Sequence, residues 1–389
     1  MLMTPNERII RTLEGKSVDR VPVMCAGLED RATNEIFGKP VIPPKLLFRN
    51  PLMKYVMNNY HGLSSFIAHT AINGGMEKHM KAAIKLGFDA MWLVSGENMM
   101  IMDNGTLGNI NGMIYNLIED GYGNMSYMYR EPAITSKKAF EAWPYFENPD
   151  DYAQRQYKFY SSMVKRHGES ICIMGSPCSG LQESMLCAVG FERMPLWIRK
   201  EKALTKRYLD WCFELILKGT MAIIDAGVKV ILQGDDFAYK TGPVFSPKVL
   251  EEMFGPYYKK IIEAVHDRGA KIILHSCGDN TVLFDMFIRW GFDGFHAYET
   301  TSNVDIFREK KIHGQVTTIM GGVGVDYLLT DRSKDEEVVN EIKRLIRELA
   351  PGGRFILAPG HSLSSVPASK MKIMVDTALE FGSYPVREV

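Results

Sequence analysis

A histidine and a cysteine two residues apart, in the segment KIILHSCGD at 271–279, are the side chains best suited to chemistry. The apolar residues before them are typical of a buried strand, which Gly278 ends. Because side chains alternate along a strand, His275 and Cys277 should face the same side. An imidazole and a thiolate are both good zinc ligands. The spacing therefore predicts a metal site where this strand ends.

Two further ligands are expected at neighbouring strand ends. Glu299 follows a strand in HAYETTSN, and His361 follows the last strand in APGHSLSS. With His275 and Cys277 they make four donors, which suits four-coordinate zinc with substrate replacing or joining a ligand. The alternative is a core histidine beside a cysteine that packs as a small apolar side chain. Against it, burying several ionisable groups at one rim without a shared role is costly.

An aspartate pair in QGDDFAYKTGPVFSP forms a second candidate cluster. Asp235 and Asp236 close a predicted strand, and Tyr239 follows in the loop. We predict a catalytic role for all three, because such groups can transfer a proton, and an aspartate can also hold a metal-bound imidazole. The alternative for Asp236 is the N-cap of a short helix.

Other side chains near strand ends are candidate substrate contacts. The predicted contacts are Glu29, Arg31, Cys178, Glu183 and Tyr298. Cys178 and Glu183 are interpreted as a pocket wall. His296 and Tyr298 lie off the face of Glu299, and we interpret both as supporting side chains.

Eight short apolar segments must position these residues. They begin at Val21, Asp89, Ser170, Val228, Lys271, Phe292, Val316 and Arg354. They are continuously apolar, as parallel strands buried on both faces are, and amphipathic helical stretches separate them. We expect an α/β chain with one (β/α)8 TIM barrel over residues 1–389, preceded by an N-terminal helical extension. A doubly wound open sheet is the alternative, but no glycine-rich dinucleotide-binding segment follows the first strand.

The stretch 98–153 is too long for a simple connection between a strand and a helix. It is rich in Gly, Asn, Tyr and Met. We predict an insertion after the second strand, a small hairpin unit that roofs the catalytic face, because loops of this length are usually functional. The 24 methionines of the chain are interpreted as flexible core filler, the alternative being an adaptable lining for an apolar substrate.

Charge and cysteine content exclude several classes of protein. Lys plus Arg and Asp plus Glu both number 46, so neither nucleic acid nor a membrane surface is an expected partner. No apolar run is long enough to span a membrane, and the first residues do not resemble a signal peptide. The six scattered cysteines indicate reduced thiols in a cytoplasmic protein. A homodimer is an open alternative to a monomer.

Several segments carry a resemblance to one family. The opening MTPNERIIRTLEGKSVDRVPV resembles the start of proteins related to uroporphyrinogen decarboxylase, and AKIILHSCGD and LAPGGRFILAPGHSLSSVP resemble later blocks. The resemblance covers nearly the whole chain and implies a TIM barrel with one of two activities, porphyrinogen decarboxylation or zinc-dependent methyl transfer. True decarboxylases carry Arg-Gln-Ala-Gly-Arg after the first strand. Here that place reads CAGLEDRATNE, with Arg31 alone, so decarboxylation is set aside.

The methyltransferase branch implies roles for the candidate ligands. It uses His-x-Cys at one strand end, here His275 and Cys277, and a cysteine at the last, where this chain has His361. Glu299 resembles in spacing a glutamate of cobalamin-independent methionine synthase. An imidazole in place of a thiolate leaves zinc more Lewis acidic, which favours removal of a methyl group from an ether or amine.

The resemblance, together with His361 in place of the usual cysteine, predicts a corrinoid-dependent methyltransferase. It would move a methyl group from a small methylated substrate, best a methoxylated aromatic, to reduced cobalt, with Asp236 or a nearby tyrosine supplying a proton. No Asp-x-His-x-x-Gly corrinoid-binding motif occurs in the chain, so a partner protein is expected to carry the corrinoid. The alternatives are a methylcobalamin:thiol methyltransferase of the coenzyme M or homocysteine type, and a non-catalytic or decarboxylase-like barrel.

Overall fold

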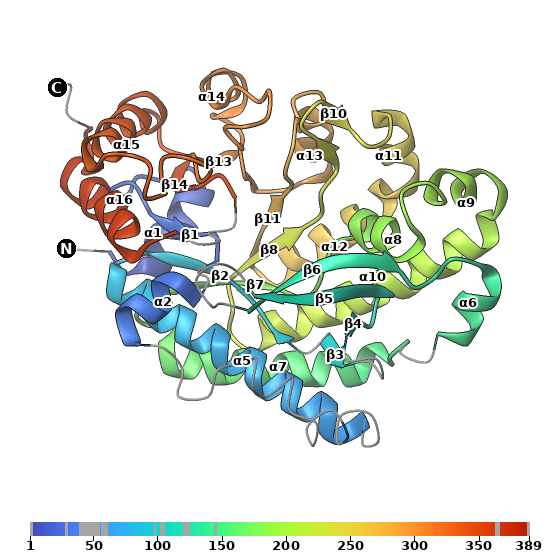
Figure 1. Cartoon of the computed structure of the whole chain (residues 1–389). Helices are drawn as coiled ribbons and strands as arrows, with labels where there is room; N and C mark the ends of the chain where they lie inside the picture. Colours follow the sequence, from blue (N-terminus) through green and yellow to red (C-terminus); the bar gives the residue numbers. More distant parts are fainter. Residues whose placement is uncertain are drawn as a thin grey trace.

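Eight parallel strands form one sheet in the order β1-β2-β7-β8-β11-β12-β13-β14 (Figure 1). The computed structural model describes residues 3–27, 30–38, 55, 61–96, 99–101, 106–119, 125–143, 146–361 and 366–386. The backbone N–H of Leu357 on the last strand donates to the carbonyl of Pro22 at 2.9 Å, and Val23 bridges Leu357 in parallel. The first and last strands therefore meet, and the predicted TIM barrel is confirmed.

Each barrel strand coincides with one of the eight segments predicted from their apolar character, and β13 runs one residue beyond its segment. They are β1 (Met24–Cys25), β2 (Ala90–Val94), β7 (Cys172–Ser176), β8 (Val230–Gly234), β11 (Lys271–His275), β12 (Gly294–His296), β13 (Thr318–Val323) and β14 (Phe355–Pro359). Side chains alternate between two environments, as in Ile273, which packs inside the barrel, and Ile272 and Leu274, which pack in the outer core with the helices. Both faces are buried, which explains the continuous apolar runs.

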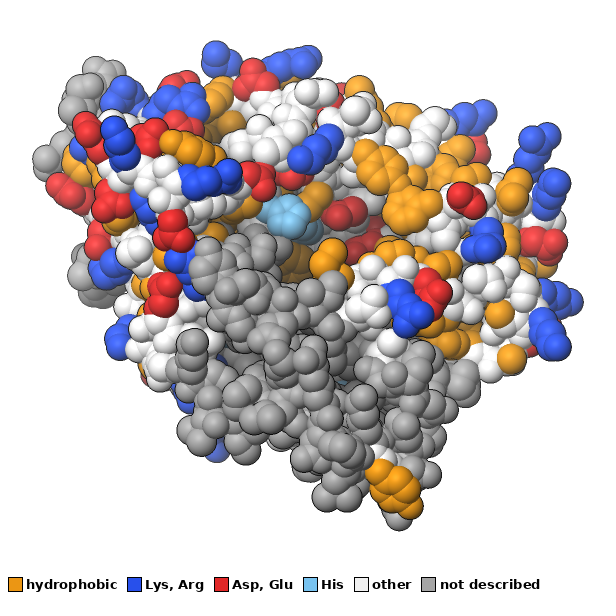
Figure 2. Space-filling view, in the orientation of Figure 1, with side chains coloured by type: hydrophobic (Ala, Val, Ile, Leu, Met, Phe, Trp, Pro, Cys, Tyr) orange, Lys and Arg blue, Asp and Glu red, His pale blue; other side chains and the backbone are white. Residues whose placement is uncertain are grey.

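Helices surround the sheet (Figure 1). They are α1 (Pro5–Leu13), α2 (Asp30–Phe37), α5 (His61–Leu86), α6 (Lys137–Ala142), α7 (Pro149–His167), α8 (Leu181–Val189), α9 (Met194–Lys200), α10 (Lys202–Asp225), α11 (Pro247–Met253), α12 (Gly255–Asp267), α13 (Phe284–Trp290), α14 (Ile306–His313), α15 (Asp335–Leu349) and α16 (Ala368–Phe381). A two-stranded ribbon, β9 (Ala238–Tyr239) and β10 (Gly242–Pro243), follows β8. Within the described ranges, no helix is both long enough and apolar enough to pass through a membrane. Acidic and basic side chains are interspersed on the surface in Figure 2.

A four-stranded antiparallel sheet follows β2, where the sequence predicts an insertion. Its strands are β3 (Met99–Ile101), β4 (Leu107–Asn109), β5 (Met113–Glu119) and β6 (Met125–Pro132). Two side chains of this region bind α8: the hydroxyl of Tyr129 donates to the Cys187 carbonyl at 2.8 Å, and Asn111 donates to the Ser184 hydroxyl at 2.6 Å. The sheet is thus anchored to the helix after β7, and its predicted role as a roof over the site stays a prediction.

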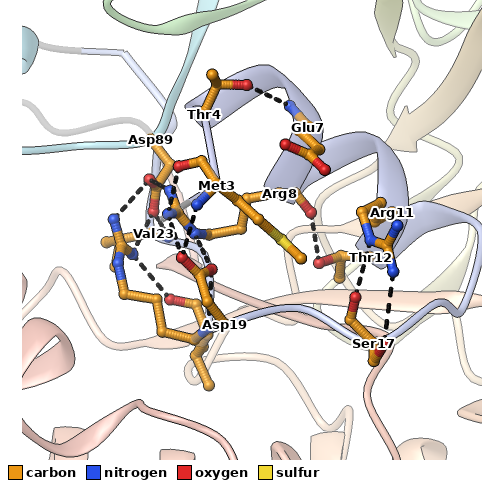
Figure 3. Close-up of polar contacts among 12 residues, drawn as sticks. Met3, Thr4, Glu7, Arg8, Arg11, Thr12, Ser17, Asp19, Val23 and Asp89 are labelled. Carbon is orange, nitrogen blue, oxygen red and sulfur yellow. Dashed lines mark hydrogen bonds and ion pairs between the residues drawn. The ribbon is translucent and has the colours of Figure 1, made fainter. Parts of the chain in front are cut away.

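The N-terminal helix α1 closes the end of the barrel opposite the strands' C-terminal ends. Its Ile9 and Leu13 pack among the side chains of the barrel interior. Arg8, on the same helix, is buried and makes two ion pairs, at 2.7 Å with Asp19 and at 2.6 Å with Asp89 (Figure 3). These pairs tie α1 to the residue that precedes β2.

Arg20 completes this network. Its two guanidinium nitrogens donate to the two carboxylate oxygens of Asp89 at 2.6 and 2.7 Å, and the backbone N–H of Val23 donates to Asp89 at 2.9 Å. The hydrogen bond from Arg8 lowers the pKa of Asp19 to about 2. Each buried charge here therefore meets an opposite charge within the chain.

Candidate metal centre

His275 ends β11 inside the barrel. It is 9% exposed, and its register partners are His296 on β12 and Gly234 on β8. The indole of Trp92 on β2 packs against its imidazole, with ring centroids 4.8 Å apart. Three neighbouring groups therefore define where this ring lies.

The loop after β11 positions the next side chains by docking on β9. The backbone N–H of Asp279 donates to the Tyr239 carbonyl at 2.7 Å. Gly278 has a φ of +83°, and a Cβ at this position would lie 2.5 Å from the Ala238 carbonyl oxygen. Only glycine meets both conditions, which explains why Gly278 follows the cysteine.

Three side chains bring potential ligand atoms together at this loop. One atom from each of Asp236, His275 and Cys277 lies within 4.8 Å of the other two. The Cys277 Sγ is 3.5 Å from His275 Nε2, and the backbone N–H of Cys277 donates to Asp236 Oδ1 at 2.8 Å. The sequence predicts the first pair, and the structure adds Asp236. Nitrogen, sulfur and oxygen donors at one point match the ligands that zinc takes in proteins.

Burial disfavours the charged forms of these groups in the absence of a cation. It lowers the pKa of His275 to about 3, helped by the nearby His361. It raises the pKa of the Cys277 thiol, with further contributions from Asp236 and Glu299, and it raises the pKa of Asp236. A bound divalent cation reverses this balance, because it favours the thiolate and the carboxylate. The donor set therefore fits a metal ion.

Asp235 acts as a helix cap supplied by a neighbouring strand. It is 0% exposed, and its carboxylate accepts the backbone N–H groups of Gln182 at 3.0 Å and Glu183 at 2.7 Å, and the Tyr258 hydroxyl at 2.6 Å. A Cβ on Gly180 would lie 2.2 Å from Asp235, so glycine is required just before α8. Burial raises the pKa of Asp235 to about 7. These contacts are structural, and its predicted catalytic role stays a prediction.

Glu183, in the first turn of α8, stands next to this pair of aspartates. Burial, followed by repulsion from Asp236 and Asp235, raises its pKa well above the ordinary value. Among the described residues, the groups that lower the pKa of these three acids are hydrogen-bond donors and His361, with no lysine or arginine. Burial and these neighbouring acids therefore favour the protonated form of Glu183 over the charged form.

The two other predicted ligands lie outside the group of three. Glu299 accepts the backbone N–H of Gly278 at 3.4 Å and the Thr301 hydroxyl at 2.8 Å. The charge of His361 acts on both His275 and Asp236. Both residues are thus neighbours of the centre, and their roles as ligands stay predictions.

Two predicted tyrosines occupy different environments. Tyr239 is 47% exposed and stacks on Phe191, with ring centroids 5.9 Å apart. Tyr298 is buried and stacks on Phe284 at 5.3 Å, and its hydroxyl has no hydrogen-bond partner among the described residues. Tyr239 therefore lies on the surface, whereas Tyr298 belongs to the core between β12 and α13.

The remaining predicted substrate contacts are buried in the core, ion-paired, or outside the described residues. Cys178 is buried in the core, where burial raises its pKa to about 12. Arg31 pairs with Glu35 at 3.1 Å and with Asp331 at 2.7 Å. Glu29 lies outside the described residues.

His296 has contacts that the sequence analysis did not predict. Its Nδ1 lies 2.6 Å from His275 Nδ1, and its Nε2 lies 2.9 Å from the Pro359 carbonyl oxygen. One sequence signal could have found it: His296 ends β12 as His275 ends β11, and parallel neighbours in register place such residues side by side.

Figure 2 shows a hollow in which acidic side chains lie beside a histidine.

Comparisons with known proteins agree with this fold. The family model described as uroporphyrinogen decarboxylase (URO-D) matches residues 129–381. Methylcobamide:CoM methyltransferase MtaA of Methanosarcina barkeri is 23% identical over 274 residues, 66% of this chain and 74% of that protein.

Two solved structures are similar over most of the chain. A methyltransferase from Methanosarcina mazei has a TM-score of 0.65 at 19% identity and covers 97% of this chain and 99% of its own. A B12-independent methionine synthase from a Shewanella species has a TM-score of 0.51 at 10% identity, and the match covers 93% of this chain and 97% of the synthase chain. At these identities the two structures support the fold alone.

Proposed function

Because the chain belongs to the uroporphyrinogen decarboxylase family, we propose that it is a methyltransferase of that family, which transfers a methyl group from a small methylated substrate to the cobalt of a separate corrinoid protein. The observation that carries the proposal is the group formed by Asp236, His275 and Cys277 at the C-terminal end of the barrel, where the chemistry of this fold takes place. The similarity to a methylcobamide:CoM methyltransferase supports it.

The metal is proposed to be zinc. His275, Cys277 and Asp236 would hold it, with Glu299 and His361 as the further candidates nearby. Bound there, zinc supplies a Lewis acid that draws electrons from the heteroatom carrying the methyl group. His275 is buried and the other two donors are half-buried, which limits the access of bulk water to the reacting groups.

Glu183 is proposed as the proton donor. When an ether loses its methyl group, the C–O bond breaks with its electron pair on oxygen, and an electron pair of reduced cobalt forms the bond to carbon. The oxygen then needs a proton, and Glu183 is suited to supply it because burial and neighbouring acids raise its pKa and favour the protonated carboxyl group. From the sequence, the expected donor is Asp236 or a nearby tyrosine, and a carboxylate oxygen of Asp236 lies among the potential ligand atoms.

The raised pKa of Glu183 also bears on the direction in which the methyl group is transferred. A thiol that accepts a methyl group must release its proton, whereas the raised pKa of Glu183 favours the protonated carboxyl group, which suits donation of a proton to a leaving oxygen. We therefore favour demethylation of an ether, best a methoxylated aromatic, over methylation of a thiol. Decarboxylation of a porphyrinogen is disfavoured because Arg31, the one arginine at that place, is paired with Glu35 and Asp331.

Two cobalamin reactions test the proposal. In one, the protein is mixed with reduced cobalamin and a panel of methoxylated phenols, and the absorbance of methylcobalamin is followed. In the other, it is mixed with methylcobalamin and thiols. We expect product in the first, and Glu183→Gln should slow it by about 10²-fold because an amide cannot donate the proton. The exposed Glu192→Gln is the control. Methylation of thiols alone would reverse the direction, and no reaction in either assay would contradict the activity.

A further inference from the structure

The contact between His275 and His296 has room for one hydrogen. The two Nδ1 atoms lie 2.6 Å apart, so one must donate and the other must accept. On its other side, His296 Nε2 lies 2.9 Å from the Pro359 carbonyl oxygen. A carbonyl oxygen only accepts, so His296 carries a hydrogen on Nε2.

The positions of both imidazole hydrogens follow from this contact. A neutral imidazole has a single N–H, so His296, protonated on Nε2, accepts at Nδ1. His275 must then donate from Nδ1, which leaves the lone pair of its Nε2 free. The exposed fractions are 9% for His275 and 2% for His296, and burial at this level disfavours a charged imidazolium. The free Nε2 is the atom 3.5 Å from the Cys277 sulfur.

We propose that His296 is a positioning residue: the Pro359 carbonyl fixes its tautomer, and His296 in turn holds His275 with Nε2 unprotonated toward the metal. The three residues end β11, β12 and β14, so the contacts cross the barrel interior. Trp92 packs on His275 at 4.8 Å and limits rotation of the ring. A metal-bound histidine commonly donates its second N–H to an acceptor, and loss of that acceptor lowers metal affinity. The inference rests on the proposed metal centre.

Metal affinity tests the role of His296. Zinc binding is measured by competition with a chromophoric chelator for the wild type and three variants. His296→Phe should weaken binding by about 10- to 100-fold, because the His275 N–H loses its acceptor. His296→Gln should restore most of the affinity, because its amide can accept from His275 and donate to Pro359. His313→Phe is the control: it removes another buried histidine, bonded to Glu309 and Asp285, and should leave zinc affinity unchanged.

Nitrogen-15 NMR of the metal-free protein reads the tautomers directly. The imidazole signals are assigned by their loss in the His275→Gln and His296→Gln variants. We expect the hydrogen on Nδ1 in His275 and on Nε2 in His296. A hydrogen on His275 Nε2, or equal zinc affinity in His296→Phe and the wild type, would overturn the inference. A wild type that binds no zinc would remove the proposed metal centre, while the NMR result would still decide the tautomers.

Discussion

Two clusters of buried and half-buried ionisable side chains lie at opposite ends of the barrel strands, and they differ in their balance of charge. The paired cluster, at the N-terminal ends, consists of Arg8, Asp19, Arg20 and Asp89, and each acid there contacts an arginine. The acidic cluster, near the C-terminal ends, consists of Glu183, Asp235 and Asp236. Repulsion from another of these acids contributes to the raised pKa of Glu183 and of Asp235. Each acid of the first cluster has an arginine partner, whereas, in the part of the chain that the structure describes, no lysine or arginine is among the groups that lower the pKa values of the second.

The difference separates a structural role from a functional one. A buried charge with an opposite partner needs nothing outside the protein. Buried acids that repel one another cost stability, and perturbed acids of this kind are typical of sites that bind a cation or move a proton. We interpret the paired cluster as the contacts that hold α1 against the barrel, and the acidic cluster as part of the proposed methyl-transfer site.

The largest effect is expected from Asp89→Asn. This substitution leaves Arg8 and Arg20 buried without their shared carboxylate, and breaking a buried pair costs about 3–5 kcal/mol. Unfolding in urea should show this loss in the free energy of unfolding. The control is Asp225→Asn, which breaks an ion pair with Arg268 whose partners are 52% and 46% exposed, and should cost less than about 1 kcal/mol. Equal losses would mean that the paired cluster is not structural.

Cys277→Ser removes a proposed metal ligand at the C-terminal ends of the barrel strands. Serine is a poor zinc ligand, so we expect the affinity for zinc to fall by at least about 10²-fold, roughly 2.7 kcal/mol. The free energy of unfolding of the metal-free protein should change little. Cys187→Ser, which removes a thiol that is not in the group of ligand atoms, should keep full zinc content. A Cys277→Ser protein with wild-type zinc affinity and methyl transfer would contradict the proposed site.

The sequence predicts the barrel strands and the part of the proposed metal centre whose residues are close together in sequence. The eight strands could be found because both of their faces are buried, which gives continuous apolar runs. The pairing of His275 with Cys277 could be found because two-residue spacing is local. The place of Asp236 could not, because it depends on a hydrogen bond from the Cys277 backbone to a different loop. The contacts of His296 depend on strand register and on the carbonyl of Pro359, which is distant in sequence.

The pH dependence of stability should distinguish the clusters. The hydrogen bond from Arg8 lowers the pKa of Asp19 from its ordinary value of 3.8 to about 2. A lowered pKa in the folded state means that stability is present above pH 4 and is lost as pH falls through 2. The contribution is about 2 kcal/mol. Asp19→Asn should therefore unfold more easily than the wild type at pH 6, and the two should converge near pH 2. A constant difference across this range would contradict the linkage.

Glu183→Gln should have the smallest effect and the opposite sign. The pKa of Glu183 is raised above its ordinary value of 4.5 by burial and by Asp236 and Asp235. A raised pKa in the folded state means that ionisation is penalised, so the cost is absent below pH 4.5 and grows as pH rises toward the folded pKa. An amide carries no such cost, and we expect the metal-free variant to be more stable than the wild type at pH 8.

The same comparison at pH 4 supplies the control for Glu183→Gln, because the wild-type carboxyl is then protonated in both states and the two proteins should have equal unfolding free energies. Glu192→Gln, at an exposed position after α8, should match the wild type at both pH values. Replacing Glu183 by its amide would thus raise the free energy of unfolding, whereas replacing Asp89 or Asp19 by asparagine would lower it. A Glu183→Gln protein that is less stable at pH 8 would show that Glu183 has a cationic partner, and the acidic cluster would then be structural, like the paired one.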